Sequence, residues 1–204
     1  MNKRIVDYLD ALFPDARCEL NYSKDYELLI AIMLSAQTTD KRVNKVTKVL
    51  FDKYKSLDDL ASAKVEDIEN IIRELGSYSK KSVYVKDIAR EILNNNGIIP
   101  NDRKFLESLN GVGRKTANVF LGVIYNEPAI AVDTHVERVS KRLKLASIND
   151  SVYEVEKKLM KKVPKDRWIR THHQLVLFGR YYCKAVKPEC DNCKLKDICK
   201  KKES

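Results

Sequence analysis

Residues 109–117 read Leu109-Asn110-Gly111-Val112-Gly113-Arg114-Lys115-Thr116-Ala117 and place a two-glycine turn between two stretches with helical periodicity. Glycine adopts backbone angles that other residues resist, and it lets a second chain approach closely. The helix after the turn begins with free N–H groups and the positive end of its dipole, which suits a phosphate group. An ordinary tight turn, in which glycine serves the backbone geometry alone, explains the two glycines equally well.

Lys115 falls in the first turn of a helix predicted over residues 114–125, where the helix dipole disfavours a positive charge. The same field favours the neutral amine, as would partial burial of the side chain. A neutral lysine is a nucleophile that can form a Schiff base with a sugar aldehyde. Contact with a phosphate is the simpler interpretation, and the local string by itself favours it.

Outward from this turn, nearly every segment has helical periodicity, and we predict an all-α fold. Residues 28–34 are apolar on all sides, which is typical of a helix buried in the middle of a bundle. A final helix is expected at about residues 167–182, and residues 130–132 are the nearest candidate for a strand. A C-terminal helix stop is expected at Gly76. Helix N-caps are expected at four polar residues: Asp40, Ser62, Asp102 and Ser151, the last in a capping box with Glu154.

Asp133 stands before another helical pattern and is a second candidate for chemistry. As an N-cap it would accept backbone hydrogen bonds, which stabilise the ionised carboxylate. A fixed anion of this kind would also stabilise positive charge developing on a deoxyribose ring, so the capping and the catalytic interpretations are compatible. His172 and His173 lie in an apolar helix and are interpreted as structural.

The charge balance favours a polyanionic partner. Lys and Arg number 39 against 29 acidic residues, a formal net charge of +10, which favours nucleic acid first and an anionic membrane second. Charged residues interrupt the N-terminal 12 residues, and the longest apolar run is too short to cross a bilayer. We therefore expect an intracellular protein, in the cytoplasm or on the nucleoid.

Four of the five cysteines crowd into the C-terminal stretch with the spacing Cys183-x6-Cys190-x2-Cys193-x5-Cys199. Four thiolates within so short a segment can surround an iron–sulfur cluster, since each iron needs one protein sulfur. Zinc is the main rival, although zinc sites often use two short Cys-x2-Cys knuckles and only one is present here. Disulfides are poorly suited to an intracellular protein. A metal-pinned basic loop would place Lys184 and Lys187 against a DNA backbone.

Along nearly its whole length the chain resembles the endonuclease III family. The resemblance rests on motifs that occur in the family's order: Leu34-Ser35-Ala36-Gln37-Thr38-Thr39-Asp40, the 109–117 string, Val132-Asp133-Thr134-His135, His172-His173 and the cysteine spacing.

This resemblance implies a base excision repair enzyme that removes oxidised pyrimidines from damaged duplex DNA and cuts the strand 3′ to the abasic site by β-elimination. Lys115 would be the nucleophile, Asp133 the essential carboxylate, and Gln37 the residue that fills the hole left by the flipped nucleotide. The four cysteines would hold a [4Fe–4S] cluster, and a monovalent cation would sit on the carbonyls of Glu107, Leu109 and Val112. The residues expected to contact DNA are Gln37, Gly111, Gly113, Arg114, Thr116, His135, Lys184 and Lys187.

The implied architecture has two helical lobes with a DNA-binding cleft between them. A six-helix domain carrying the helix-hairpin-helix would span residues 20–130, and residues 1–19 and 131–204 would form the cluster domain. A monomer without membrane attachment would suffice.

Two departures from the family pattern, and three alternatives, stay open. Asn110 replaces the usual proline before the first glycine, which would make the hairpin less rigid. Ser77 stands where relatives place an apolar wedge, a role that Tyr78 would take over. The alternatives are a monofunctional mismatch glycosylase of the same superfamily, a non-catalytic helix-hairpin-helix module and a zinc-stabilised nucleic-acid binder.

Overall fold

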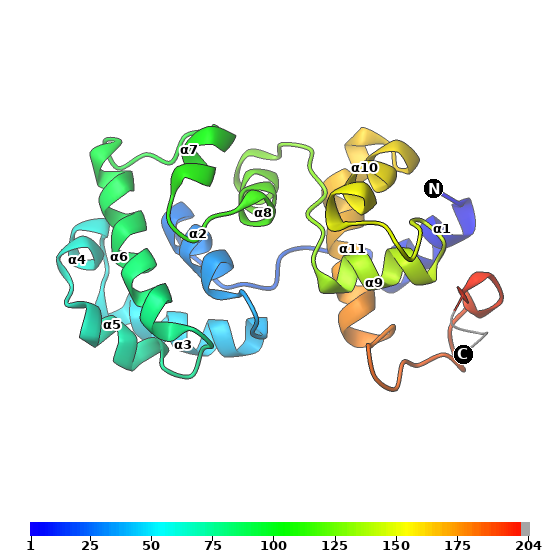
Figure 1. Ribbon diagram of the computed structural model, residues 1–204, viewed down its shortest axis with the longest axis horizontal. Helices are drawn as coiled ribbons and strands as arrows, with labels where there is room; N and C mark the ends of the chain where they lie inside the picture. Colours follow the sequence, from blue (N-terminus) through cyan, green and yellow to red (C-terminus); the bar gives the residue numbers. More distant parts are fainter. Residues whose placement is uncertain (201–204) are drawn as a thin grey trace. The chain divides into compact units, whose positions relative to one another are not determined.

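The computed structural model describes residues 1–200, and over these residues the chain forms helices and connecting segments but no strand, which confirms the all-α prediction. Residues 130–132 form an irregular segment. The chain divides into two compact units (Figure 1). Glu19–Tyr125 forms one, here called the hairpin unit, and Met1–Cys18 joins the chain from Asn126 onward in the other, the cysteine unit.

The hairpin unit is a stack of helices around one fully enclosed helix. Its helices are, in chain order, α2 (Asp25–Leu34), α3 (Asp40–Lys53), α4 (Leu57–Ser62), α5 (Val65–Ile72), α6 (Tyr78–Asn94), α7 (Arg103–Ser108) and α8 (Arg114–Tyr125). This makes seven helices in the described unit where six were expected, and two of the seven, α4 and α5, are short and separated only by Ala63 and Lys64.

The enclosed helix is α2, as its sequence predicts. Every residue from Tyr26 to Leu34 is buried, and α2 packs against α3, α6 and α8. A helix that is apolar on all faces is stable only when other helices cover all of them. Each large apolar side chain buried in this way contributes about 1.5–3 kcal/mol. Glu27 is the polar exception, and its carboxylate accepts hydrogen bonds from the backbone N–H groups of Ser23 (2.7 Å) and Lys24 (3.3 Å).

Two expected caps and one expected stop in this unit are wrong. Thr39, not Asp40, is the N-cap of α3, and its hydroxyl accepts from the Arg42 N–H. Ser62, expected to cap α5, is the last residue of α4 and bonds back to the Asp58 carbonyl at 2.7 Å, while Lys64 holds the N-cap position of α5. Helix α5 ends at Ile72, before the expected stop at Gly76.

The cysteine unit is built from both ends of the chain. Its helices are, in chain order, α1 (Lys3–Leu12), α9 (Thr134–Arg142), α10 (Val152–Lys162), the 3₁₀ helix η1 (Lys165–Arg167), α11 (Trp168–Tyr181) and the 3₁₀ helix η2 (Lys196–Ile198). Figure 1 draws α1 in blue beside the red C-terminal segment. The Arg4 guanidinium joins these ends by donating to the Asp197 carboxylate (2.8 Å) and to the Lys194 carbonyl.

An apolar core closes this unit where α1, α9 and α11 meet. Ile5 and Leu9 of α1, Val139 of α9 and Phe178 of α11 are all buried in it. Three of the expected caps are confirmed across the two units: Asp102 caps α7, Asp133 caps α9, and Ser151 with Glu154 forms the capping box of α10. Within residues 1–200, no helix combines the length and the apolar character needed to span a bilayer.

Candidate active site

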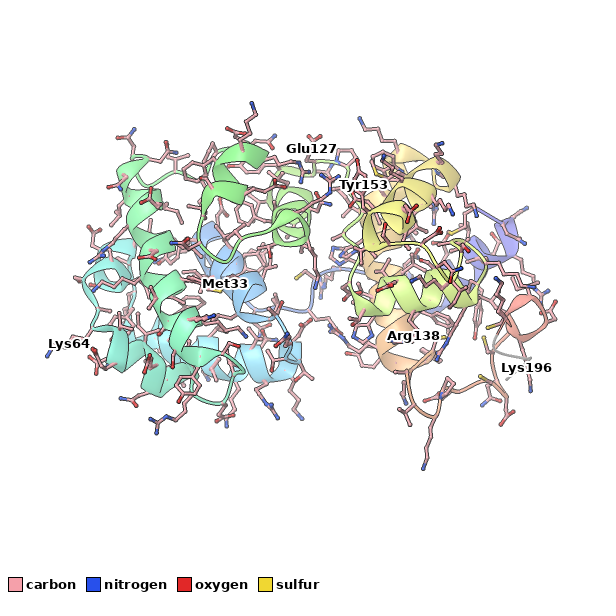
Figure 2. The ribbon with its side chains drawn as sticks, in the orientation of Figure 1. Met33, Lys64, Glu127, Arg138, Tyr153 and Lys196 are labelled. Carbon is pink, nitrogen blue, oxygen red and sulfur yellow. The ribbon has the colours of Figure 1, made fainter. Side chains whose placement is uncertain are left out.

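The two-glycine turn between α7 and α8 is fixed by close packing on one side and open on the other. Gly111 has a φ of +80°, and a Cβ placed there would lie 2.5 Å from Tyr84 Cδ2 and 3.1 Å from Met33 Cγ. Only glycine therefore fits, both for the backbone angle and for the space left by Tyr84 and by Met33, which Figure 2 labels on α2. Gly113 faces open space, with nothing within 4 Å of a Cβ. The turn thus leaves its second glycine accessible to a ligand.

Asn110, which replaces proline in the family pattern, bonds to the neighbouring helix. Its side-chain amide donates to the Asp87 carboxylate of α6 at 3.0 Å. This bond restrains the turn by a different means from the fixed φ of proline. The backbone N–H of Val112 donates to the Leu109 carbonyl at 3.0 Å, so this carbonyl, one of three expected cation ligands, already accepts one hydrogen bond.

Lys115 is the second residue of α8 and is exposed, as is Arg114 beside it. The partial burial that the sequence suggested for Lys115 is not seen. Its position at the positive end of the helix dipole is as expected, because α8 begins at Arg114 directly after Gly113. Thr116 is half-buried and Ala117 is buried, so the helix turns its next residues inward. The amine is therefore presented outward from the start of α8.

Gln37 lies in the short segment between α2 and α3, exposed and with a left-handed backbone (φ +60°). A residue with a Cβ rarely adopts this angle, and such residues cluster at functional sites. Ser77, the residue before α6 that replaces the apolar wedge, is also left-handed, with a φ of +56°. The following Tyr78 is half-buried, and its ring lies under the Arg73 guanidinium at 5.9 Å. The ring of Tyr78 is thus engaged with Arg73.

Asp133 is held at the start of α9 by two backbone hydrogen bonds. Its Oδ1 accepts from the N–H groups of His135 (2.9 Å) and Val136 (2.8 Å). Among residues 1–200, nothing donates a hydrogen bond to Oδ2. The hydrogen bonds to Oδ1 therefore fix the orientation of the carboxylate and leave Oδ2 available to a ligand.

His135 is packed into the cysteine unit. Arg138, labelled on α9 in Figure 2, has its Nη2 3.1 Å from His135 Nδ1. Burial lowers the pKa of His135, so the ring is neutral near pH 7. A Cβ on Gly179 would lie 2.8 Å from the His135 Cβ, so glycine at this position lets α11 pack closely on α9.

The buried histidine pair supports the segment that leads to Asp133. His172 Nδ1 lies 2.8 Å from the Ala131 carbonyl, two residues before Asp133. The imidazole rings of His172 and His173 are 4.8 Å apart. Burial and the neighbouring His172 lower the pKa of His173 to about 3, which keeps it neutral. Both histidines are therefore part of the packing of α11.

All four C-terminal cysteines line one cavity of about 400 Å³ in the cysteine unit. Arg142 closes one side, with Nη1 lying 3.3 Å from Cys183 Sγ and donating to the Lys184 carbonyl at 2.7 Å. Over residues 1–200, no three His, Cys, Asp or Glu side chains are close enough to share a single metal ion. A cubane cluster takes one cysteine sulfur on each of its four irons, and four cysteines line this cavity.

Of the two lysines next to the cysteines, one forms an ion pair and the other is exposed. Lys184 Nζ pairs with the Glu189 carboxylate at 2.8 Å, while Lys187 is exposed and left-handed, with a φ of +49°. Both lie on the loop that leads from Cys183 to Cys190.

Sequence reasoning missed one polar residue of the hairpin unit. Lys81 is buried on α6, in the same helical register as the buried Val85, Ile88 and Ile92. A lysine that continues an apolar register is the signal that would have found it. Its partners are the Leu34 carbonyl of α2 and the Ala36 carbonyl after that helix, both distant in the sequence.

Comparisons with known proteins agree with this geometry. A family model described as HhH-GPD superfamily base excision DNA repair protein matches residues 30–165. Endonuclease III of Bacillus subtilis (strain 168) is 49% identical over 196 residues, which cover 96% of this chain and 90% of that protein. Endonuclease III of Escherichia coli (strain K12) is 44% identical over 191 residues, covering 93% and 90%. A solved structure of a trapped endonuclease III–DNA covalent intermediate is 48% identical, with a TM-score of 0.93 over 100% of this chain and 98% of that one.

Proposed function

The chain belongs to the HhH-GPD superfamily of base excision DNA repair proteins, and we propose that it is a bifunctional DNA glycosylase and abasic-site lyase of the endonuclease III type. Its substrates are oxidised pyrimidines and abasic sites in damaged duplex DNA, and a monomer carries out the reaction. The observation that carries this proposal is Lys115, an outward-facing amine at the start of the helix that follows the two-glycine turn.

The chemistry assigned to Lys115 is nucleophilic catalysis. Its neutral amine forms a bond to the sugar C1′, the glycosidic bond breaks, and the base leaves with the bonding electrons and takes up a proton. Ring opening then leaves a Schiff base between Nζ and C1′. Loss of a proton from C2′ expels the 3′ phosphate by β-elimination, and water finally releases the lysine.

Asp133 would stabilise the positive charge that develops on the sugar as the base leaves. A carboxylate held in advance costs no reorganisation during the reaction. Two backbone N–H groups hold Oδ1, so the unbonded Oδ2 is the atom we assign to this role. Lys115 lies in the hairpin unit and Asp133 in the cysteine unit.

Contacts to DNA would come from both units. The open side of the turn at Gly113, with Gly111, Arg114 and Thr116, would bind a backbone phosphate through N–H groups at the start of α8. Gln37 would fill the space left by the extruded nucleotide. His135, Lys184 and Lys187 would add contacts from the cysteine unit.

A [4Fe–4S] cluster is the group we assign to Cys183, Cys190, Cys193 and Cys199, since all four line one cavity. When bound, the cluster would supply a rigid centre for the loop from Cys183 to Cys199, and this loop carries Lys184 and Lys187. A monovalent cation on the carbonyls of Glu107, Leu109 and Val112 is the second group assigned.

The domain boundaries we propose are 20–130 for the helix-hairpin-helix domain, and 1–19 with 131–204 for the cluster domain.

Borohydride trapping tests the proposed function. Purified protein is incubated with a duplex carrying one thymine glycol, and borohydride reduces any Schiff base to a stable protein–DNA adduct. We expect an adduct with the wild-type protein and none with Lys115→Ala, which should still bind the duplex. Base release with neither adduct nor strand cleavage would instead assign a monofunctional glycosylase. Binding without any reaction would assign a DNA-binding module.

A further inference from the structure

Lys81 is the buried cation of the hairpin unit. Only 6% of its surface is exposed, although it lies in the first turns of α6, close to the exposed residues Ser77 and Ser79. Burial lowers the pKa of Lys81, so the position is costly for an ammonium group unless specific acceptors surround it. A buried polar group of this kind calls for a structural reason.

The acceptors are two backbone carbonyls, one at the last residue of α2 and one two residues after it. Lys81 Nζ donates to the Leu34 carbonyl at 3.0 Å and to the Ala36 carbonyl at 2.7 Å. The final carbonyls of a helix have no partner within the helix and carry the negative end of its dipole, so an ammonium group satisfies both needs. The two acceptor carbonyls lie on either side of Ser35, the C-cap residue of α2.

Gln37 follows directly after the second of these carbonyls. Its left-handed backbone, with a φ of +60°, is rarely populated by a residue with a Cβ and persists only where neighbouring contacts determine it. Helix α2 packs against α6 (Figure 1), so Lys81 ties the turn carrying Gln37 to the first turns of α6. These are the turns that follow Ser77, the residue at the wedge position.

We propose that Lys81 is a positioning residue that holds the 35–38 turn in the conformation from which Gln37 enters the DNA base stack. This inference rests on the proposed function, because it assigns Lys81 to the base-extrusion step of that reaction. Lys81 itself touches neither DNA nor the reacting sugar; it acts through the backbone of the turn. An apolar side chain of similar length would fill the space but leave two buried carbonyls without a donor.

The same helix offers a matched control. Lys86 Nζ also donates from α6 to a backbone carbonyl, that of Ala63 at 2.6 Å, but this bond holds the segment between α4 and α5. Lys86→Met removes a comparable anchor without touching the Gln37 turn. Comparing Lys81→Met with Lys86→Met therefore distinguishes the general effect of losing a lysine–carbonyl bond from the specific effect of freeing the Gln37 turn.

A double-mutant cycle tests the proposal. Single-turnover base release from a duplex with one thymine glycol is measured for wild type, Lys81→Met, Gln37→Ala and the double variant. Alanine keeps the Cβ at residue 37, so the backbone strain is unchanged. We expect Lys81→Met to slow wild type by about 10- to 100-fold and to slow Gln37→Ala by less than about threefold. Lys86→Met should slow wild type by less than about threefold.

Equal slowing by Lys81→Met in both backgrounds, or no slowing in wild type, would overturn the role of Lys81 while leaving the proposed function intact. A wild-type protein that forms no borohydride adduct would overturn the proposed function and this inference together. If Lys81→Met does not fold, the cycle is run with Lys81→Gln. Hydrogen exchange gives a second measurement: the variant should exchange faster at residues 35–38 and unchanged at 57–72. Unchanged exchange at 35–38 would overturn the proposal.

Discussion

Helices α8 and α9 begin in opposite ways, and each start carries one of the two residues to which we assign the chemistry. Asp133 precedes α9 and accepts two of its N–H groups. Lys115 is the second residue of α8, and its side chain is exposed. One helix start therefore carries a hydrogen-bonded carboxylate and the other an exposed amine. Stabilising a cation and attacking carbon are the two roles that we assign to this carboxylate and this amine.

The interiors of the two units differ as well. The hairpin unit is organised around α2, from which Tyr26 to Leu34 are all buried. Its buried polar side chains are spread over several helices, with Glu27 on α2 and Lys81 on α6. The cysteine unit gathers His172, His173 and Gln174 in succession on α11, and it contains the thiol-lined cavity.

Neutralising the anion at α9 gives the largest expected effect. Asp133→Asn keeps an oxygen that can cap the helix, so the fold should persist while the charge is lost. We expect single-turnover base release to fall by about 10²- to 10⁴-fold, the range typical of a lost charge-stabilising or acid–base group. Release of free thymine glycol from a duplex that carries one such base, followed by chromatography, measures this.

The matched control is Asp102→Asn, the same change at the N-cap of α7, where the carboxylate accepts from the Lys104 N–H at 2.8 Å. It should slow base release by less than about threefold, because N-cap replacement by Asn is nearly neutral. Equal losses in the two variants would assign Asp133 a capping role only.

Removing one thiol should affect the cysteine unit and leave the hairpin unit unchanged. Cys193→Ser is expected to loosen the loop that carries Lys184 and Lys187, because a metal–thiolate site contributes folding free energy directly. We expect DNA affinity to fall by about 10- to 100-fold, since the basic loop supplies phosphate contacts. Hydrogen exchange should rise at residues 183–199 and stay low in α2. Faster exchange in both regions would show that the hairpin unit also depends on the cysteine loop.

The smallest expected effect concerns the buried histidines of α11. The pKa of His173 is about 3 in the folded protein, well below the value of about 6.5 for an unfolded chain. The unfolded state therefore binds a proton that the folded state excludes, and stability falls as the pH drops from about 6.5 toward 3. By pH 5 this linkage costs about 2 kcal/mol. In His173→Gln, the loss of unfolding free energy between pH 7 and pH 5 should be smaller by that amount, as measured with urea. An unchanged pH dependence in His173→Gln would show that the proton taken up on unfolding binds to a residue other than His173.

Local patterns predicted the helices well where a start or a stop depends on neighbouring residues. Helix α8 begins and ends where its sequence indicates, and Asp133 and Ser151 cap as expected. The error at Asp40 has a local cause, because the neighbouring Thr39 caps the same helix. The error at Ser62 arises because Ser62 ends α4, and α5 begins only after Lys64. Long-range contacts were beyond reach: Lys81 pairs with carbonyls 47 and 45 positions away, and no periodicity reveals such partners.

In the candidate site, too, some features could be predicted from the local sequence and others depend on the tertiary fold. The cysteine spacing indicated one metal-binding group, and the four thiols line one cavity. The exposure of Lys115, the bond from Asn110 to Asp87 and the packing of Gly111 against Tyr84 follow from the tertiary fold, which the string 109–117 does not encode by itself.

The central claim is that the amine at the start of α8 becomes covalently joined to the sugar. Borohydride-trapped protein is digested with trypsin and nuclease, and the modified peptide is sequenced by mass spectrometry. We predict a reduced sugar adduct on Lys115 and on no other lysine. An adduct on a different lysine, or on the N-terminal amine, with Lys115 unmodified would contradict the assignment.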